Sequence, residues 1–91
     1  MRFEFEVFGK VQGVWFRKYT KKKADSLKIT GWVKNTDKGT VVGQAYSTDS
    51  NKILEFKKFL CEEGSPKSRI DACDITDLND GEDYKSFTII R

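Results

Sequence analysis

The sequence predicts an α+β fold in which a β-sheet is covered on one face by two helices. Apolar residues alternate with polar ones over several short segments, as in half-buried strands, and recur at helical spacing over two others. These segments follow one another in the order strand, helix, strand, strand, helix, strand. Ninety-one residues suffice for one two-layer core, so we expect residues 1–91 to form a single domain.

The N-terminal segment is predicted to be a strand that leads into a helix. Phe3, Phe5 and Val7 alternate with charged residues, which is the pattern of a strand with one buried face. A helix is predicted over residues 16–27, where lysines cover the side opposite the apolar residues. Its expected apolar face consists of Phe16, Tyr19, Ala24 and Leu27.

The next two segments form a predicted hairpin. Strands are expected over residues 29–35 and 40–46, and the four residues between them have the composition of a turn. Gly39, the last of the four, can adopt the left-handed conformation that such a turn needs.

The second half of the chain contains another helix and two further strands. Asp49 or Ser50 can cap a helix that Gly64 ends and Pro66 prevents from resuming. The apolar face of this helix consists of Ile53, Phe56, Phe59 and Leu60. A fourth strand is expected within residues 69–77, followed by a turn at 79–81 and a short last strand over 84–91.

This order of elements is βαββαβ with an extra C-terminal strand, which predicts a ferredoxin-like sandwich with an antiparallel sheet and both helices on one face. Following the strand directions, the loop after the first strand and the hairpin after the second lie at the same end of the sheet. We therefore expect Arg17 and Asn35 to be neighbours there. The second helix ends at that end too, and a terminal strand antiparallel to the fourth would bring Arg91 back to it.

The stretch between the first strand and the first helix is the main functional motif. Gly9 and Gly13 bracket a short loop that runs into a helix with Arg17 near its start. Glycine allows backbone N–H groups to approach a ligand closely, and a helix N-terminus adds N–H donors and partial positive charge. A guanidinium beside these donors makes the place suited to a phosphate-like anion.

Composition excludes several kinds of chemistry. The chain contains no histidine, which rules out Ser-His-Asp and Cys-His catalysis and histidine-ligated metals. Its formal net charge of +3 favours encounter with an anionic substrate but is too small to indicate nucleic-acid binding. Cys61 and Cys73 form no C-x-x-C motif, and we expect free thiols rather than a disulfide or metal ligands. With no apolar run of membrane-spanning length and no signal peptide, we expect a cytoplasmic protein.

Two motifs carry a resemblance to a known family. Residues 7–17 read Val-Phe-Gly-Lys-Val-Gln-Gly-Val-Trp-Phe-Arg, and residues 31–35 read Gly-Trp-Val-Lys-Asn and are followed by Gly39 and Val41. Both resemble the signatures of the acylphosphatases, and the Gly-Ser-Pro and Ser-Arg-Ile-Asp within residues 64–71 resemble the vertebrate-type enzymes. Ser47 departs from the glycine that usually ends the second signature. We expect an altered turn there, away from the site.

The resemblance implies an enzyme that hydrolyses acyl phosphates to a carboxylate and inorganic phosphate, with phosphate also a competitive ligand. It assigns phosphate binding to Arg17 and orientation of the attacking water to Asn35. The implied phosphate-binding loop consists of Lys10, Val11, Gln12, Gly13, Val14, Trp15, Phe16 and Arg17, with Gly9, Thr36 and Thr40 in support. It implies neither a metal nor an organic cofactor. Several acyl phosphates would fit a site that mainly binds the phosphate end.

Other interpretations stay open at this point. A ferredoxin-like domain can bind RNA through aromatic residues on its central strands, but here acidic residues are interleaved with those of the first strand. A phosphate-sensing domain without catalysis is the second alternative. Gln12 is expected to brace the loop rather than touch ligand, and Trp15 and Trp32 are expected to be core or rim aromatics. We expect a monomer that binds neither nucleic acid nor membranes.

Overall fold

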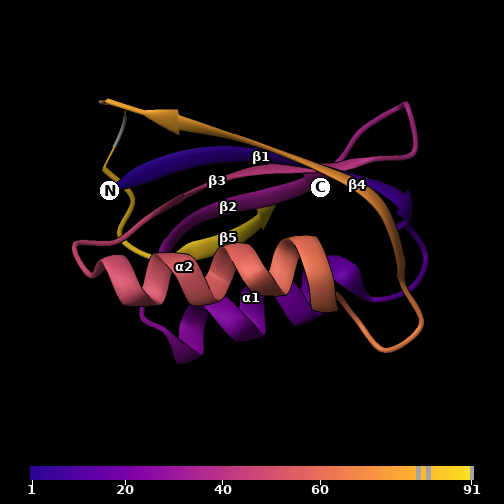
Figure 1. Ribbon diagram of the computed structural model, residues 1–91, viewed down its shortest axis with the longest axis horizontal. Coiled ribbons are helices and arrows are strands. Elements are labelled where there is room, and N and C mark those ends of the chain that lie inside the picture. The colour runs from indigo at the N-terminus through magenta and orange to yellow at the C-terminus, as the bar shows by residue number, and fades with distance from the viewer. Residues whose placement is uncertain (80, 82, 91) are drawn as a thin grey trace.

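The computed structural model describes residues 1–79, 81 and 83–90, which form one five-stranded sheet with two helices on one face (Figure 1). The elements are β1 Arg2–Lys10, α1 Phe16–Ser26, β2 Thr30–Asn35, β3 Val41–Tyr46, α2 Ser50–Lys58, the π-helical turn η1 Phe59–Glu63, β4 Arg69–Leu78 and β5 Phe87–Ile90. The strands lie side by side in the order β4-β1-β3-β2-β5. The predicted order of elements is confirmed.

The hydrophobic core lies between the sheet and the helices. Phe3, Phe5 and Val7 of β1 are all buried on the side that faces the helices. Phe56 of α2 packs against them, with ring centroids 6.3 Å from Phe3 and 6.4 Å from Phe5. Glu4, between the two phenylalanines, is exposed on the opposite face. The alternation in the sequence therefore gives the orientation of β1 correctly.

Helix α1 buries one residue that differs from the expectation. Its buried residues are Phe16, Thr20 and Ala24, and Tyr19 is 37% exposed. Positions four apart stay on one face of a helix with 3.6 residues per turn, whereas a position three residues on lies at the edge of that face. The prediction of Tyr19 as a core residue is therefore wrong.

Helix α2 begins and ends as its sequence predicts. The Asp49 carboxylate accepts hydrogen bonds from the N–H groups of Asn51 and Lys52, at 2.9 and 3.3 Å, so Asp49 rather than Ser50 is the N-cap. At the other end, α2 continues into η1, which ends at Gly64 with φ 64°. This positive φ favours glycine.

The last strand gives the sheet its mixed character. Strands β4, β1, β3 and β2 pair antiparallel as expected, but β5 pairs parallel with β2. The expectation of a wholly antiparallel sheet is therefore corrected. β5 does run opposite to β4, and its C-terminal end lies at the same end of the sheet as those of β1 and β2 (Figure 1). The expected return of Arg91, and Asp80 of the expected turn, lie outside the described residues.

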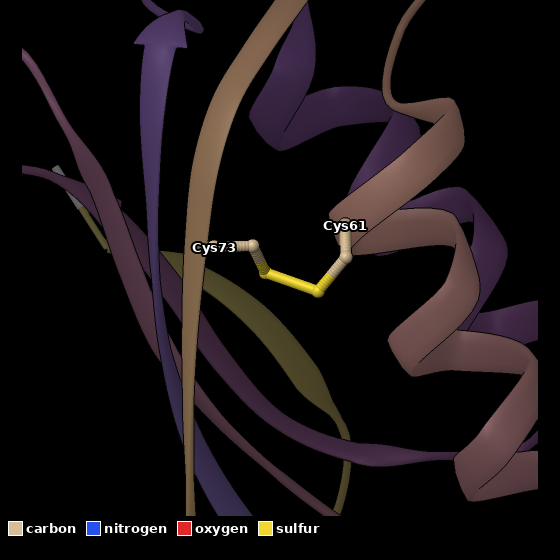
Figure 2. Close-up of a disulfide and its surroundings, with 2 residues drawn as sticks. All are labelled: Cys61 and Cys73. Atoms are coloured by element: carbon tan, nitrogen blue, oxygen red, sulfur yellow. A yellow bond between two sulfur atoms is a disulfide. The ribbon is translucent and has the colours of Figure 1, made fainter.

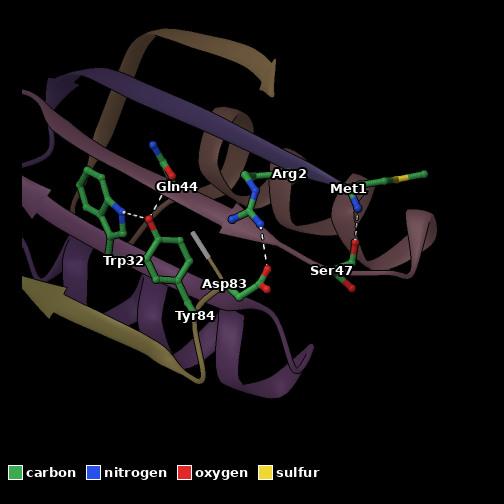
Figure 3. Close-up of polar contacts among 7 residues, drawn as sticks. All are labelled: Met1, Arg2, Trp32, Gln44, Ser47, Asp83 and Tyr84. Carbon is green, nitrogen blue, oxygen red and sulfur yellow. Dashed lines mark hydrogen bonds and ion pairs between the residues drawn. The ribbon is translucent and has the colours of Figure 1, made fainter. Parts of the chain in front are cut away.

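The segment before β5 packs on the open face of the sheet, away from the helices (Figure 3). Trp32 Nε1 donates to the hydroxyl of Tyr84 at 3.1 Å, and that hydroxyl donates to Gln44 Oε1 at 3.2 Å. Asp83 pairs with the buried Arg2, whose guanidinium is 3.3 Å away. These contacts confirm that Trp32 is a rim aromatic that faces away from the core.

Ser47 lies at the end of the sheet opposite the loop at residues 9–17. Its carbonyl accepts a hydrogen bond from the N-terminal amino group of Met1 at 2.7 Å (Figure 3). Its hydroxyl accepts from the N–H of Asp49 at 3.1 Å, just before α2. The difference from the family glycine therefore falls in the turn into α2, as expected.

The two cysteines form a disulfide that joins η1 to β4 (Figure 2). Their Cα atoms lie 5.3 Å apart, within the usual range for such a bond. The expectation of free thiols is wrong because Cys61 and Cys73 approach only through tertiary packing. No spacing rule places a helix end over a particular residue of the edge strand.

Candidate functional site

Three residues between the end of β1 and the start of α1 have positive φ: Gly9 (129°) within β1, and Gly13 (73°) and Trp15 (63°) in the loop that follows. At Gly9 a side chain would collide with the backbone of Arg69 on β4, so glycine is needed there for close approach. Trp15 is the N-cap of α1, and its side chain accepts no hydrogen bond from the first turn. The N–H groups at the start of α1 are therefore not capped by Trp15.

Gln12 joins this loop to the hairpin that follows β2. Its Nε2 donates to the carbonyl oxygens of Thr36 and Thr40, at 2.8 and 2.9 Å. The side chain thus spans the two segments, as the bracing interpretation predicted.

The hairpin at residues 35–40 is closed by its own threonines and by Glu6. The Thr36 and Thr40 hydroxyls lie 2.6 Å apart, and Thr40 Oγ1 donates to Glu6 Oε2 at 2.6 Å. Because the single hydroxyl proton of Thr40 goes to the carboxylate, Thr36 is the donor to Thr40. The sequence does not identify Glu6 as a supporting residue. Because Glu6 is next to the inward-facing Val7 in β1, its side chain lies on the opposite face of the sheet, where it contacts Thr40.

Ser65 supports the loop from the other side. Its side chain is buried, and its Oγ donates to the carbonyl oxygen of Val14 at 2.7 Å. Ser65 lies in the Gly-Ser-Pro that resembles the family, but nothing in the sequence indicates its contact with Val14. It holds the backbone two residues before the start of α1.

Asn35 ends β2 and carries an unsatisfied acceptor. Its backbone pairs with Val41 across the hairpin, and its Oδ1 is buried without a hydrogen-bond partner among the described residues. Buried polar atoms in proteins are almost always hydrogen-bonded, to protein or to ordered water. An orphaned amide oxygen at this end of the sheet marks Asn35 as a candidate functional residue.

Arg17 lies in the first turn of α1 and is half-buried. None of the described carboxylates forms an ion pair with it. It contributes to a surface hollow of about 750 Å³. The residues that line the hollow are Val11, Gly13, Trp15, Phe16, Arg17, Lys18 and Ile89.

Arg69, at the nearby end of β4, shows the opposite state of a guanidinium. Its Nε and Nη2 donate to the two carboxylate oxygens of Asp71, at 2.9 and 3.2 Å. These hydrogen bonds and the opposite charge hold the pKa of Asp71 below its usual value. Arg69 is thus occupied by a carboxylate, whereas Arg17 is available to an external anion.

The structure brings together only some of the predicted loop side chains. Five of the eight line the hollow, while Lys10 is exposed at the end of β1, Gln12 turns to the hairpin and Val14 is buried. Asn35 lies at the same end of the sheet but is not among the residues that line the hollow. Any phosphate contact from Gln12 or Val14 would therefore come from the backbone.

The acidic residues near the C-terminus are dispersed. Asp77 pairs with Lys57 at 3.1 Å, and Asp83 pairs with Arg2. Within the described part of the chain, no three or more His, Cys, Asp or Glu side chains gather in a way that could hold a metal ion. None of the described helices is long and apolar enough to cross a membrane.

Comparison with known proteins shows what the chain is similar to. The acylphosphatase family model matches residues 3–89. Acylphosphatase-1 of Xenopus laevis is 55% identical over 67 residues, which are 74% of this chain and 67% of the relative. Acylphosphatase-1 of Mus musculus is 43% identical over 90 residues, covering 97% and 90% of the two chains. The crystal structure of an acylphosphatase from Bacillus subtilis superposes with a TM-score of 0.93 at 33% identity, covering 99% of this chain and 98% of that one.

Proposed function

The chain belongs to the acylphosphatase family, enzymes that hydrolyse acyl phosphates, and we propose that Arg17 and Asn35 carry out this reaction at the end of the sheet where β1 and β2 terminate. The observation that carries the proposal is the Arg17 guanidinium, which has no described carboxylate partner and lies at a helix N-terminus. A phosphoryl group fits this combination of charge and backbone donors.

Phosphate binding falls to Arg17 and the 9–17 loop. The planar guanidinium donates two parallel hydrogen bonds to two phosphate oxygens, which fixes the orientation of the group as well as its charge. Backbone N–H groups of residues 10–17 and the dipole of α1 stabilise the remaining negative charge. The supports from Gln12 and Ser65 keep this backbone in place before substrate arrives.

Orientation of the attacking water falls to Asn35. Its unsatisfied Oδ1 accepts a hydrogen bond from the water, which leaves a lone pair on the water oxygen free to attack phosphorus. The new P–O bond forms as the bond to the acyl oxygen breaks, and the electron pair leaves with the carboxylate. An amide is not a useful base, so the water proton passes to solvent or to a phosphate oxygen.

The reaction needs few other catalytic groups from the protein. A carboxylate is a good leaving group, so no strong general acid is needed, and positioning with preorganised charge supplies most of the acceleration. We propose that the reaction uses neither a metal nor an organic cofactor. Inorganic phosphate, which is the product, then competes with substrate for Arg17.

The alternative of an RNA-binding module is not favoured. Phe3 and Phe5 of the central strand β1 are buried against the helices, and Glu4 occupies the open face between them. Stacking of bases needs exposed aromatics on that face. The part of the face near Trp32 is contacted by Tyr84.

Three further features belong to this proposal. We propose that residues 1–91 act as one domain, as a monomer and in the cytoplasm. The Cys61–Cys73 disulfide offers a check on location, since such bonds persist mainly in oxidising compartments. Trapping thiols at cell lysis shows whether Cys61 and Cys73 are reduced or disulfide-bonded in the cell. In gel filtration, a monomer elutes as a species of 10.5 kDa.

Assaying the purified protein against acyl phosphates and a phosphate monoester tests the function. Benzoyl phosphate and acetyl phosphate should be hydrolysed, with inorganic phosphate as a competitive inhibitor, and p-nitrophenyl phosphate should be nearly inert because its leaving group is poorer. Equal turnover of the monoester would contradict the mechanism. Binding of phosphate without any turnover would indicate a phosphate-sensing domain.

A further inference from the structure

The side chain of Trp15 is placed unusually for a large apolar residue. It is 67% exposed, and the residue has φ 63°, in the left-handed region that bulky side chains seldom adopt. The side chain gains little from burial, and the left-handed backbone conformation is unfavourable for a bulky residue. Folding alone does not explain a tryptophan at this position.

The indole lies at the edge of the hollow that also contains Arg17. Ile89 of β5, which is only partly buried, lines the same hollow, and the almost fully buried Val11 and Phe16 lie at its base. Lys18 Nζ lies 5.0 Å from the centroid of the Trp15 ring, a cation–π contact that restrains the indole. The hollow therefore places the Arg17 guanidinium and the Lys18 ammonium beside the accessible apolar side chains of Trp15 and Ile89.

The in-line geometry of phosphoryl transfer indicates on which side of phosphorus the acyl group lies relative to the attacking water. In phosphoryl transfer the nucleophile and the leaving group lie roughly in line on opposite sides of phosphorus. Asn35, which we assign to the water, is not among the residues that line the hollow, whereas Arg17 is. A phosphate held by Arg17 with water at Asn35 would thus direct its acyl group into the hollow beside Trp15.

We propose that Trp15, together with Ile89, forms the subsite for the acyl group, and that the preferred substrates are acyl phosphates with an apolar, planar acyl group such as an aromatic one. This inference rests on the proposed function. An indole and an aromatic acyl group pack through offset or edge contacts, and neither needs a hydrogen bond. A methyl group, as in acetyl phosphate, has much less apolar surface to pack against the indole.

A comparison of two substrates in three variants tests the subsite. Trp15→Ala removes the indole but keeps the backbone amide, and Trp15→Phe restores an aromatic ring. Tyr19→Ala is the matched control, because Tyr19 is an exposed aromatic of α1 that does not line the hollow. For each protein, kcat/KM is measured with benzoyl phosphate and with acetyl phosphate, and the Ki of inorganic phosphate is recorded.

Trp15→Ala should lower kcat/KM for benzoyl phosphate about five- to tenfold more than it lowers kcat/KM for acetyl phosphate. Trp15→Phe should recover most of the loss, and Tyr19→Ala should leave the ratio of the two substrates unchanged. An equal fall for both substrates, or no change for benzoyl phosphate, would overturn the subsite. If the wild-type protein turned over neither substrate, the proposed function itself would fail.

Discussion

The 9–17 loop and the 35–40 hairpin meet at one end of the sheet, yet they are held in different ways. The loop takes its shape from positive φ angles at Gly9, Gly13 and Trp15, and it depends on other elements for support. The hairpin is a short connection between adjacent antiparallel strands, closed mainly by hydrogen bonds among its own residues. Gln12 is the side chain that spans both.

Because of this difference, we expect the loop and the hairpin to have separate roles in the reaction. The loop presents N–H groups and Arg17, all of which are donors, so damage to it should weaken the hold on phosphate. The hairpin positions Asn35, whose acceptor Oδ1 has no hydrogen-bond partner among the described residues, so damage to the hairpin should slow the step that involves water. Measuring kcat and the Ki of phosphate separately distinguishes the two regions.

Arg17→Lys should have the largest effect on the loop. The charge remains, but an ammonium cannot form two parallel hydrogen bonds in one plane, so kcat/KM for benzoyl phosphate should fall by about 100-fold or more. The phosphate Ki should rise in the same variant. Steady-state kinetics with phosphate as competitor measures both, and retention of near wild-type activity would remove the bidentate role.

Thr40→Val should act on the hairpin alone. The substitution removes the hydroxyl that lies between Thr36 and Glu6, and it leaves the partly buried Glu6 carboxylate without this donor. Because the hairpin that positions Asn35 is then less well held, kcat should fall by about tenfold. The phosphate Ki should stay within about twofold of the wild-type value. Thr76→Val, at an exposed position on β4, is the control and should change neither constant. A rise in Ki as large as the fall in kcat would argue against separate roles.

Ser65→Ala should have a smaller effect, confined to the loop. It leaves the buried carbonyl of Val14 without its partner, at a cost of about 1–2 kcal/mol shared between stability and phosphate binding. We expect the phosphate Ki to rise by about three- to fivefold with kcat nearly unchanged. Ser26→Ala removes an exposed hydroxyl contact on α1 and serves as control. A change in kcat with an unaltered Ki would reverse the assignment.

The sequence predicts most of the fold because the deciding patterns are local. Alternation in β1, the turn at Gly39 and the helix end at Gly64 each depend on a few neighbouring residues. The position of β5 does not, since its parallel pairing with β2 follows from where the segment with Asp83 and Tyr84 crosses the sheet. The disulfide is likewise a consequence of how η1 packs on β4.

The residues of the candidate site likewise differ in whether the sequence alone indicates their role. The glycines and Arg17 are recognisable because they all lie within residues 9–17 and because glycine's conformational freedom and arginine's charge both suit anion binding. Glu6 and Ser65 are not, since each is an ordinary strand or loop residue whose role comes from a neighbour more than thirty positions away. Only the folded structure brings these partners together.

The most direct test of the account is Asn35→Ala, measured for kcat with benzoyl phosphate and for the Ki of inorganic phosphate. We expect kcat to fall by about 100-fold, because the water loses its orienting acceptor, while the phosphate Ki stays within about twofold of the wild-type value. An unchanged kcat, or a loss explained wholly by weaker phosphate binding, would contradict the assignment of the water to Asn35.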